Sequence, residues 1–275
     1  DRRTVKHIDG ARIEGWFTED FTLAELKRLK ARERIPLLRP KNRSFDDQER
    51  IPTLDEILAL VQAEEQRLGR RIGLYPETKH PSHFRSLGLP LEPPLLRALG
   101  DAGYCRQDPV FIQSFESGNL MALRQETDLR LIQLMDSKGT PPDRSDTPFA
   151  GMATAAGLRR IATYADGVGV AKAMVIPRGP GERLVAPTAL VADAHAAGLL
   201  VHVWTFRPEN AFLPAEYRRG LRPWHRGDAE GEIRAFLEAG IDGLFSDSTD
   251  SAFRARQAFL AAVPRQAPPE QGQEN

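Results

Sequence analysis

The sequence predicts an α/β fold built around a parallel sheet, and three observations support this. From about residue 70 onward, short apolar runs alternate with amphipathic stretches of helical length. The runs are partly β-branched and do not alternate cleanly with polar residues, which is typical of strands buried on both faces. Four runs follow a helical stretch that ends in glycine, the residue that favours a left-handed helix cap. The predicted strands cover 72–77, 110–115, 129–135, 167–171, 199–206 and 241–246.

The spacing of these strands narrows the architecture to two possibilities. Six β/α units in residues 71–263 correspond to about 32 residues per unit, close to a (β/α) barrel in which eight units take about 250 residues. A doubly wound open sheet has a similar spacing, so the pattern alone leaves both folds open.

The two ends of the chain differ from this regular region. Residues 1–70 predict two helices, each opened by a capping box, Thr22-x-x-Glu25 and Thr53-x-x-Glu56, and no convincing strand. Residues 34–52 have the composition of a loop, so we interpret 1–70 as an insertion or flanking region. Residues 264–275 are rich in Pro, Gln and Glu and are predicted to be disordered. We therefore expect one domain, residues 1–263.

Composition excludes several classes of protein. Lys plus Arg and Asp plus Glu both number 38, so a neutral chain offers little support for nucleic-acid binding or electrostatic membrane association. No run of about 18 apolar residues predicts a membrane span. The single cysteine, Cys105, excludes an internal disulfide and an all-Cys zinc site. Because the chain begins with Asp1, we expect a mature, processed or truncated product. The composition leaves the oligomeric state open.

Candidate functional residues follow the predicted strands, since active sites of parallel β/α folds lie at the carboxyl ends of strands. Glu77 and Lys79 end the first strand and are two residues apart, so both side chains can point the same way. A carboxylate suits a hard cation and an ammonium suits an anion such as phosphate. The alternative is a local ion pair at the end of a strand.

Three other strand ends carry candidate binding residues. Gln113 and Phe115 end the second strand, Trp204 lies in the fifth and Asp247 follows the sixth. An indole there could pack against the apolar face of a polyol or headgroup. The alternatives are a core tryptophan and, for Asp247, a carboxylate at a helix N-terminus. The six histidines show no metal-binding spacing, and no residue stands out as catalytic.

The ordered set of these segments resembles the glycerophosphodiester phosphodiesterase family, specifically its longer bacterial, often periplasmic, subgroup. The resemblance covers about residues 15–260. Its segments are IGLYPETKHP (72–81), FIQSF (111–115), YADGVG (164–169), VHVWTF (201–206) and GIDGLFSD (240–247), with FTEDFTLAELK (17–27) and IPTLDE (51–56) resembling the insertion region.

The resemblance implies a TIM-type barrel that hydrolyses glycerophosphodiesters, a small-molecule substrate, to an alcohol and glycerol 3-phosphate with Ca²⁺ or Mg²⁺. By the same resemblance Glu77 is a metal ligand, Lys79 lies near the phosphate and Trp204 lies at the glycerol end. Gln113, Phe115 and Asp247 would line the pocket. The subgroup also implies a periplasmic or secreted location.

The sequence departs from the family at its start. The family's His-Arg-Gly, Glu-x-Asp and His-Asp motifs are absent, so we expect a barrel N-terminally truncated to about six of eight strands. Both acid/base histidines and two metal carboxylates would be missing, and we expect this chain alone to be inactive. Free strand edges would then promote aggregation or dimerisation.

Two other functions remain open from the sequence. The chain could be a non-catalytic binder of glycerophosphodiesters or another anionic polyol, with Lys79 and Trp204 providing recognition. It could also be a different barrel phosphodiesterase that acts on phospholipid or sphingolipid headgroups. The Pro-Glu-Thr-Lys and Trp-Thr segments favour the glycerophosphodiester reading.

Overall fold

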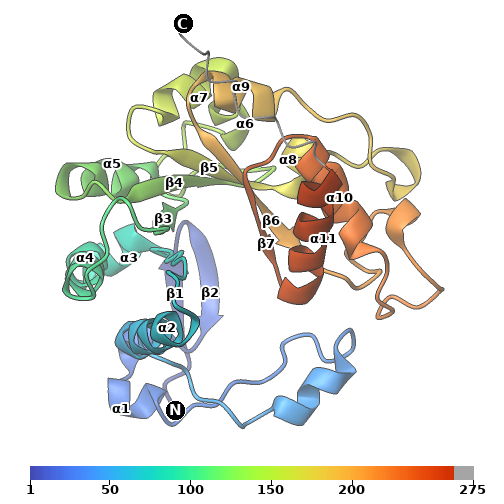
Figure 1. Ribbon diagram of the computed structural model, residues 1–275. Helices are drawn as coiled ribbons and strands as arrows, with labels where there is room; N and C mark the ends of the chain where they lie inside the picture. Colours follow the sequence, from blue (N-terminus) through green and yellow to red (C-terminus); the bar gives the residue numbers. More distant parts are fainter. Residues whose placement is uncertain (263–275) are drawn as a thin grey trace, which may run out of the picture.

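A curled, five-stranded parallel sheet organises the computed structural model, which describes residues 1–262 (Figure 1). Each strand pairs with its neighbour along the chain, in the order β3-β4-β5-β6-β7. The strands are β3 (Phe111–Ser114), β4 (Arg130–Met135), β5 (Gly167–Ala171), β6 (Leu200–Phe206) and β7 (Gly243–Ser246). The curvature of the sheet confirms the predicted TIM-type α/β fold. The tail predicted to be disordered, 264–275, lies outside the described residues.

The predicted strand at 72–77 forms only isolated bridges to the segment that carries β3. Leu74 bridges Val110 and Glu77 bridges Gln113, both in parallel orientation. The Gln113 N–H donates to the Pro76 carbonyl at 2.9 Å, and Pro76 has no N–H to donate in return. A regular strand was therefore the wrong expectation, but the segment still lies along the edge of the sheet and places Glu77 beside Gln113.

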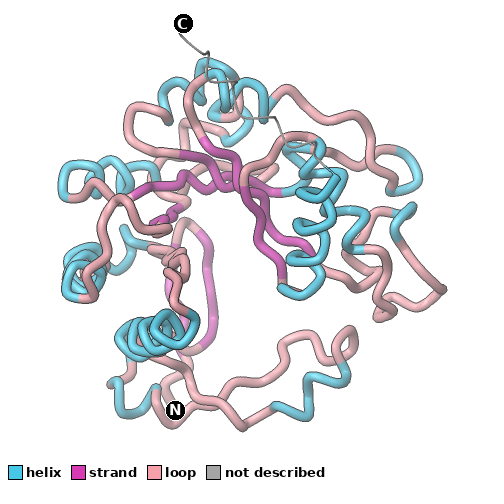
Figure 2. Tube along the Cα trace, viewed as in Figure 1, coloured by secondary structure: helices cyan, strands magenta, loops and turns pink. Residues whose placement is uncertain are grey.

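The helices between successive strands lie on the outer, convex face of the curled sheet (Figures 1 and 2). Strand residues such as Ile112, Leu131, Val168 and Val201 are fully buried beneath them. The helices from residue 81 onward are α3 (Pro81–Ser86), α4 (Glu92–Asp101), α5 (Ser117–Glu126), α6 (Phe149–Met152), α7 (Ala155–Ile161), α8 (Lys172–Val175), α9 (Leu190–Ala196), α10 (Ala229–Glu238) and α11 (Thr249–Ala262), with short 3₁₀ turns η3 (Pro180–Glu182) and η4 (Ala215–Tyr217). None of the helices within residues 1–262 has the length and apolarity needed to cross a bilayer.

An antiparallel hairpin, β1 (Thr4–Ile8) and β2 (Ala11–Gly15), opens the chain. The expectation of no strand in residues 1–70 was therefore wrong. Asp9 and Gly10 form the turn with positive φ values of 52° and 76°. An Asp-Gly pair adopts this conformation readily and is a strong hairpin signal, which the sequence analysis overlooked.

The remaining N-terminal elements agree with the sequence analysis. They are η1 (Thr18–Asp20), α1 (Leu23–Leu26), η2 (Pro40–Phe45) and α2 (Leu54–Leu68). Both predicted capping boxes are present, on Thr22 and Thr53, and Gly69 ends α2 in the left-handed conformation. Apart from η2, residues 34–52 form a loop, as predicted.

Aromatic side chains fill the interior of the curl. Tyr75 Oη lies 2.6 Å from Nδ1 of His202 in β6, and its ring meets Phe245 of β7 with ring centroids 4.7 Å apart. Phe111 of β3 stacks on Tyr75 at 5.3 Å. Burial raises the pKa of Tyr75 and lowers that of His202, so both groups are neutral at pH 7. These contacts connect the two ends of the sheet although no β-pairing joins them in the described residues.

Candidate functional site

A pocket of about 280 Å³ lies at the carboxyl ends of β3, β4 and β6. It brings together five residues that the sequence analysis selected: Glu77, Lys79, Gln113, Phe115 and Trp204. Leu134, Thr205 and Phe245 complete its lining. Side chains that are up to 168 positions apart in the chain, from Glu77 to Phe245, therefore share one cavity, because parallel strands end at the same side of the sheet.

Glu77 and Lys79 present opposite charges to this pocket. The Lys79 Nζ lies 3.7 Å from Glu77 Oε1, so the local ion pair considered above is formed. However, the Lys79 side chain is 66% exposed and that of Glu77 is 25% exposed. Exposed pairs of this kind contribute about 0–1 kcal/mol to stability, so an anion that enters the pocket can replace Glu77 as the partner of the Lys79 ammonium at little cost in free energy.

Trp204 forms a wall of the pocket in a defined orientation. Its Nε1–H donates to the Gly169 carbonyl of β5 at 3.1 Å. Phe115 meets the indole edge to face, with ring centroids 6.1 Å apart. The indole is partly exposed and is therefore not a core tryptophan. Buried Gln113 places an amide beside these two rings.

A neighbouring cavity of about 320 Å³ extends the site and contains residues that the sequence analysis did not select. Glu77, Lys79 and Phe115 line both cavities, and the second adds Asp9 and His80 among others. The Asp9 carboxylate and His80 Nδ1 form a hydrogen bond. His80 follows Lys79 directly in the sequence, but Asp9 reaches it only because the N-terminal hairpin docks there.

Glu116 is a further acidic group of the second cavity. Its carboxylate accepts hydrogen bonds from the Ser82 backbone N–H and hydroxyl. Burial raises its pKa above the ordinary glutamate value, although the bonds from Ser82 oppose the change. No sequence spacing linked these two residues.

Asp247 does not line the pocket that contains Lys79 and Trp204. The structure places it in a different cavity, where Arg39 Nη2 and Arg207 Nε each lie 2.8 Å from its Oδ2. Burial opposes ionisation, but the hydrogen bonds from the two arginines outweigh it and lower the pKa of the Asp247 carboxyl. The structure therefore does not bring Asp247 together with the other five residues, and the 34–52 loop supplies an arginine that binds it.

The described residues do not fit a complete divalent-cation site. Ca²⁺ takes 6–8 oxygen ligands, and within residues 1–262 no group of three or more His, Cys, Asp or Glu side chains is arranged to hold a metal ion. Glu77 also has the Lys79 ammonium as a neighbour.

Comparison with known proteins agrees with this fold. The sequence model of the glycerophosphoryl diester phosphodiesterase family matches residues 1–251. The chain belongs to this family. A glycerophosphodiester phosphodiesterase of Arabidopsis thaliana is 31% identical over 280 residues, which cover 97% of this chain and 71% of that protein. A glycerophosphodiester phosphodiesterase of Haemophilus influenzae is 24% identical, with 86% of this chain and 69% of that protein covered.

Solved structures support the barrel architecture. A glycerophosphoryl diester phosphodiesterase of Silicibacter pomeroyi matches with a TM-score of 0.62 and 18% identity, covering 90% of this chain and 71% of that one. One from Agrobacterium tumefaciens matches with a TM-score of 0.54 and 17% identity, covering 94% and 79%. At these identities the structural matches establish the fold alone.

Proposed function

We propose that the pocket lined by Glu77, Lys79 and Trp204 binds a glycerophosphodiester. The protein that contains these residues would hydrolyse it to an alcohol and glycerol 3-phosphate. The observation that carries this proposal is the convergence of one ammonium, one carboxylate and one oriented indole in a single cavity. The family to which the chain belongs supports the class of reaction.

Each side chain has a role that its chemistry suits. The exposed Lys79 ammonium pairs with the phosphodiester anion. Trp204 and Phe115 pack against the carbon face of the glycerol, and the Gln113 amide forms hydrogen bonds with its hydroxyl groups. Glu77 accepts a hydrogen bond from a hydroxyl, or supplies one oxygen ligand to the Ca²⁺ or Mg²⁺ ion on which the proposed activity depends.

Turnover demands more than these residues provide. Hydrolysis of a phosphodiester requires charge stabilisation at phosphorus, a general base and a general acid. Residues 1–262 contain no group of carboxylates and histidines that completes a cation site. We therefore propose that this 275-residue chain binds a glycerophosphodiester without hydrolysing it at a measurable rate.

Calorimetric titration with glycerophosphocholine tests the binding. We expect binding that persists in EDTA, weakens about tenfold or more in Lys79→Met and is unchanged in Arg97→Met, an exposed control on α4. An equal effect of both variants, or no binding by the unsubstituted chain, would contradict the pocket assignment.

An assay of glycerol 3-phosphate release with Ca²⁺ or Mg²⁺ tests the chemistry separately. Rapid release by the 275-residue chain would show that it is active and that its catalytic groups have been misassigned. A non-catalytic binder remains the second candidate, because the cation site is incomplete in the described residues. Release supports the hydrolase, whereas binding without release supports the binder.

A further inference from the structure

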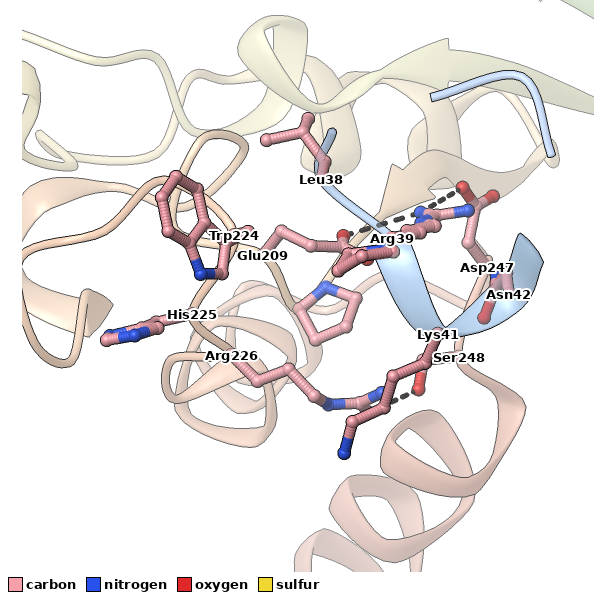
Figure 3. Close-up of a pocket in the computed structure, with 12 residues that line it drawn as sticks. Leu38, Arg39, Lys41, Asn42, Glu209, Trp224, His225, Arg226, Asp247 and Ser248 are labelled. Atoms are coloured by element: carbon pink, nitrogen blue, oxygen red, sulfur yellow. Dashed lines mark hydrogen bonds and ion pairs between the residues drawn. The ribbon is translucent and has the colours of Figure 1, made fainter. Parts of the chain in front are cut away.

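A third cavity, of about 500 Å³, lies between the 34–52 loop and the segments that follow β6 and β7 (Figure 3). It shares no lining residue with the Glu77–Lys79–Trp204 pocket. Its lining consists of Leu38, Arg39, Pro40, Lys41, Asn42, Pro208, Glu209, Trp224, His225, Arg226, Asp247 and Ser248. The function proposed above uses none of these residues.

The two carboxylates of this cavity are already neutralised. Arg39 Nε lies 2.7 Å from Glu209 Oε1, and its Nη2 lies 2.8 Å from Asp247 Oδ2. Arg207, next to the cavity, also binds Asp247 at 2.8 Å. Neither carboxylate is therefore available to neutralise another cation or to attract a cationic ligand.

Two further cations of the lining have a distant carboxylate partner or none within residues 1–262. Lys41 is exposed and has no carboxylate within salt-bridge distance in residues 1–262. Arg226 donates to the neutral hydroxyl of Ser248 at 2.7 Å, and the carboxylate nearest to it, on Asp250, is 3.9 Å away. Asp250 itself accepts hydrogen bonds from Ser248 and Arg254. Figure 3 shows the Lys41 and Arg226 side chains on the same side of the cavity.

The excess of positive charge defines the ligand. The excess lies at Lys41 and Arg226: Lys41 has no carboxylate within salt-bridge distance in residues 1–262, and the Asp250 carboxylate, 3.9 Å from Arg226, is also paired with Arg254 at 3.2 Å. Trp224 adds a partly exposed indole wall (43% exposed), on which the nonpolar part of a ligand can pack. A phosphate monoester combines a near-dianionic head with an organic group at neutral pH.

We propose that this cavity is a binding site for a phosphate monoester. The phosphate binds between Lys41 and Arg226, and the organic group packs against Trp224. Charge-assisted hydrogen bonds from an ammonium and a guanidinium are the usual means of phosphate recognition. Because Lys41 lies in η2 and Arg226 lies just before α10, the bound ligand holds the 34–52 loop against the barrel.

Calorimetric titration with inorganic phosphate and with glycerol 3-phosphate tests the site. We expect the Lys41→Ala/Arg226→Ala variant to bind both at least about tenfold more weakly at this site. The matched control, Arg97→Ala/Arg159→Ala, removes the same charge from exposed positions on α4 and α7 and should bind normally. Trp224→Ala should reduce glycerol 3-phosphate binding more than phosphate binding. Co-sedimentation with vesicles that contain phosphatidic acid distinguishes a lipid-borne monoester from a soluble one.

Hydrogen exchange offers a readout that is independent of affinity. Amides of residues 41–45 should gain protection with glycerol 3-phosphate in the unsubstituted chain but not in Lys41→Ala/Arg226→Ala. If that variant binds as well as its control, the proposal is wrong. If Lys79→Met alone abolishes all phosphate binding, it is also wrong, because the only site is then the Lys79 pocket. Binding that survives Lys79→Met and is lost in Lys41→Ala/Arg226→Ala supports this site even if the proposed function fails.

Discussion

Arg39 and Asp247 are 208 residues apart in the chain, yet Arg39 Nη2 lies 2.8 Å from Asp247 Oδ2. The same guanidinium binds Glu209 through two hydrogen bonds of 2.7 and 3.3 Å. These bonds raise the pKa of Arg39 above its ordinary value, so the guanidinium is charged at any pH at which the protein folds. A single side chain from the 34–52 loop therefore binds two acidic groups beyond the carboxyl ends of β6 and β7.

Replacing Arg39 should destabilise the fold. In Arg39→Ala, the Glu209 side chain, which is 7% exposed, loses its guanidinium partner. Removing one member of a largely buried pair costs about 2–4 kcal/mol in the free energy of unfolding. The control Arg32→Ala breaks the exposed pair with Asp47 and should cost about 1 kcal/mol or less. Urea unfolding measures both values, and similar losses in the two variants would contradict this account.

The N-terminal hairpin should detach in acid. Glu19 in η1 accepts hydrogen bonds from Lys6 of β1 at 2.8 Å and His83 of α3 at 2.9 Å. Burial opposes ionisation of Glu19, but these bonds outweigh it and lower its pKa from 4.5 to about 2. A lowered carboxyl pKa stabilises the folded state above pH 4.5, and this contribution is lost as the pH falls toward 2.

Hydrogen exchange of residues 4–15 measures this transition. Protection should decrease between pH 4.5 and 2 in the unsubstituted chain. Glu19→Gln should lower protection already at pH 7 and remove much of the pH dependence. Glu126→Gln, at an exposed position on α5, should behave like the unsubstituted chain. Unchanged exchange in Glu19→Gln would show that other contacts hold the hairpin.

The orientation of Trp204 should matter for binding. Trp204→Phe removes the hydrogen bond to the Gly169 carbonyl and part of the pocket wall. A lost hydrogen bond of about 1 kcal/mol corresponds to about a fivefold weaker affinity for glycerophosphocholine. Trp16→Phe, which changes an exposed tryptophan outside the pocket, should leave the affinity unchanged. Titration calorimetry measures the affinity of both variants, and equal affinities would show that Trp204 is not part of the binding site.

Two glycines provide a matched pair for stability. A Cβ at Gly243 in β7 would lie 2.7 Å from Cδ2 of His202, whose ring is held by Tyr75. Gly243→Ala should therefore destabilise the sheet by about 1–3 kcal/mol. A Cβ at Gly100 in α4 meets nothing within 4 Å, so Gly100→Ala should stabilise by about 0.5–1 kcal/mol. The melting temperature, measured by circular dichroism, should fall in Gly243→Ala and rise in Gly100→Ala. Equal shifts in the two variants would contradict the packing described here.

Local patterns were enough to predict the periodic part of the fold. The buried runs at 129–135 and 167–171 became β4 and β5 with at most one residue of difference, because burial on both faces requires continuous apolar sequence. The capping boxes at Thr22 and Thr53 formed for an equally local reason, since a side chain binds a backbone three residues away. The Asp9-Gly10 turn carried a local signal as well, so the hairpin of β1 and β2 was predictable from the sequence.

The sequence by itself determined that strand ends would collect polar and aromatic side chains, because parallel strands end at the same side of a sheet. It also placed Glu77 and Lys79 close together, since they are two residues apart. Only the tertiary structure decided that Asp9 meets His80 and that Arg39 binds Asp247. Those partners lie in a hairpin turn and a loop with no hydrophobic periodicity, so their positions depend on how distant segments pack. Long-range packing thus decides whether a carboxylate at the end of a strand faces the pocket, as Glu77 does, or binds an arginine from a distant loop, as Asp247 does.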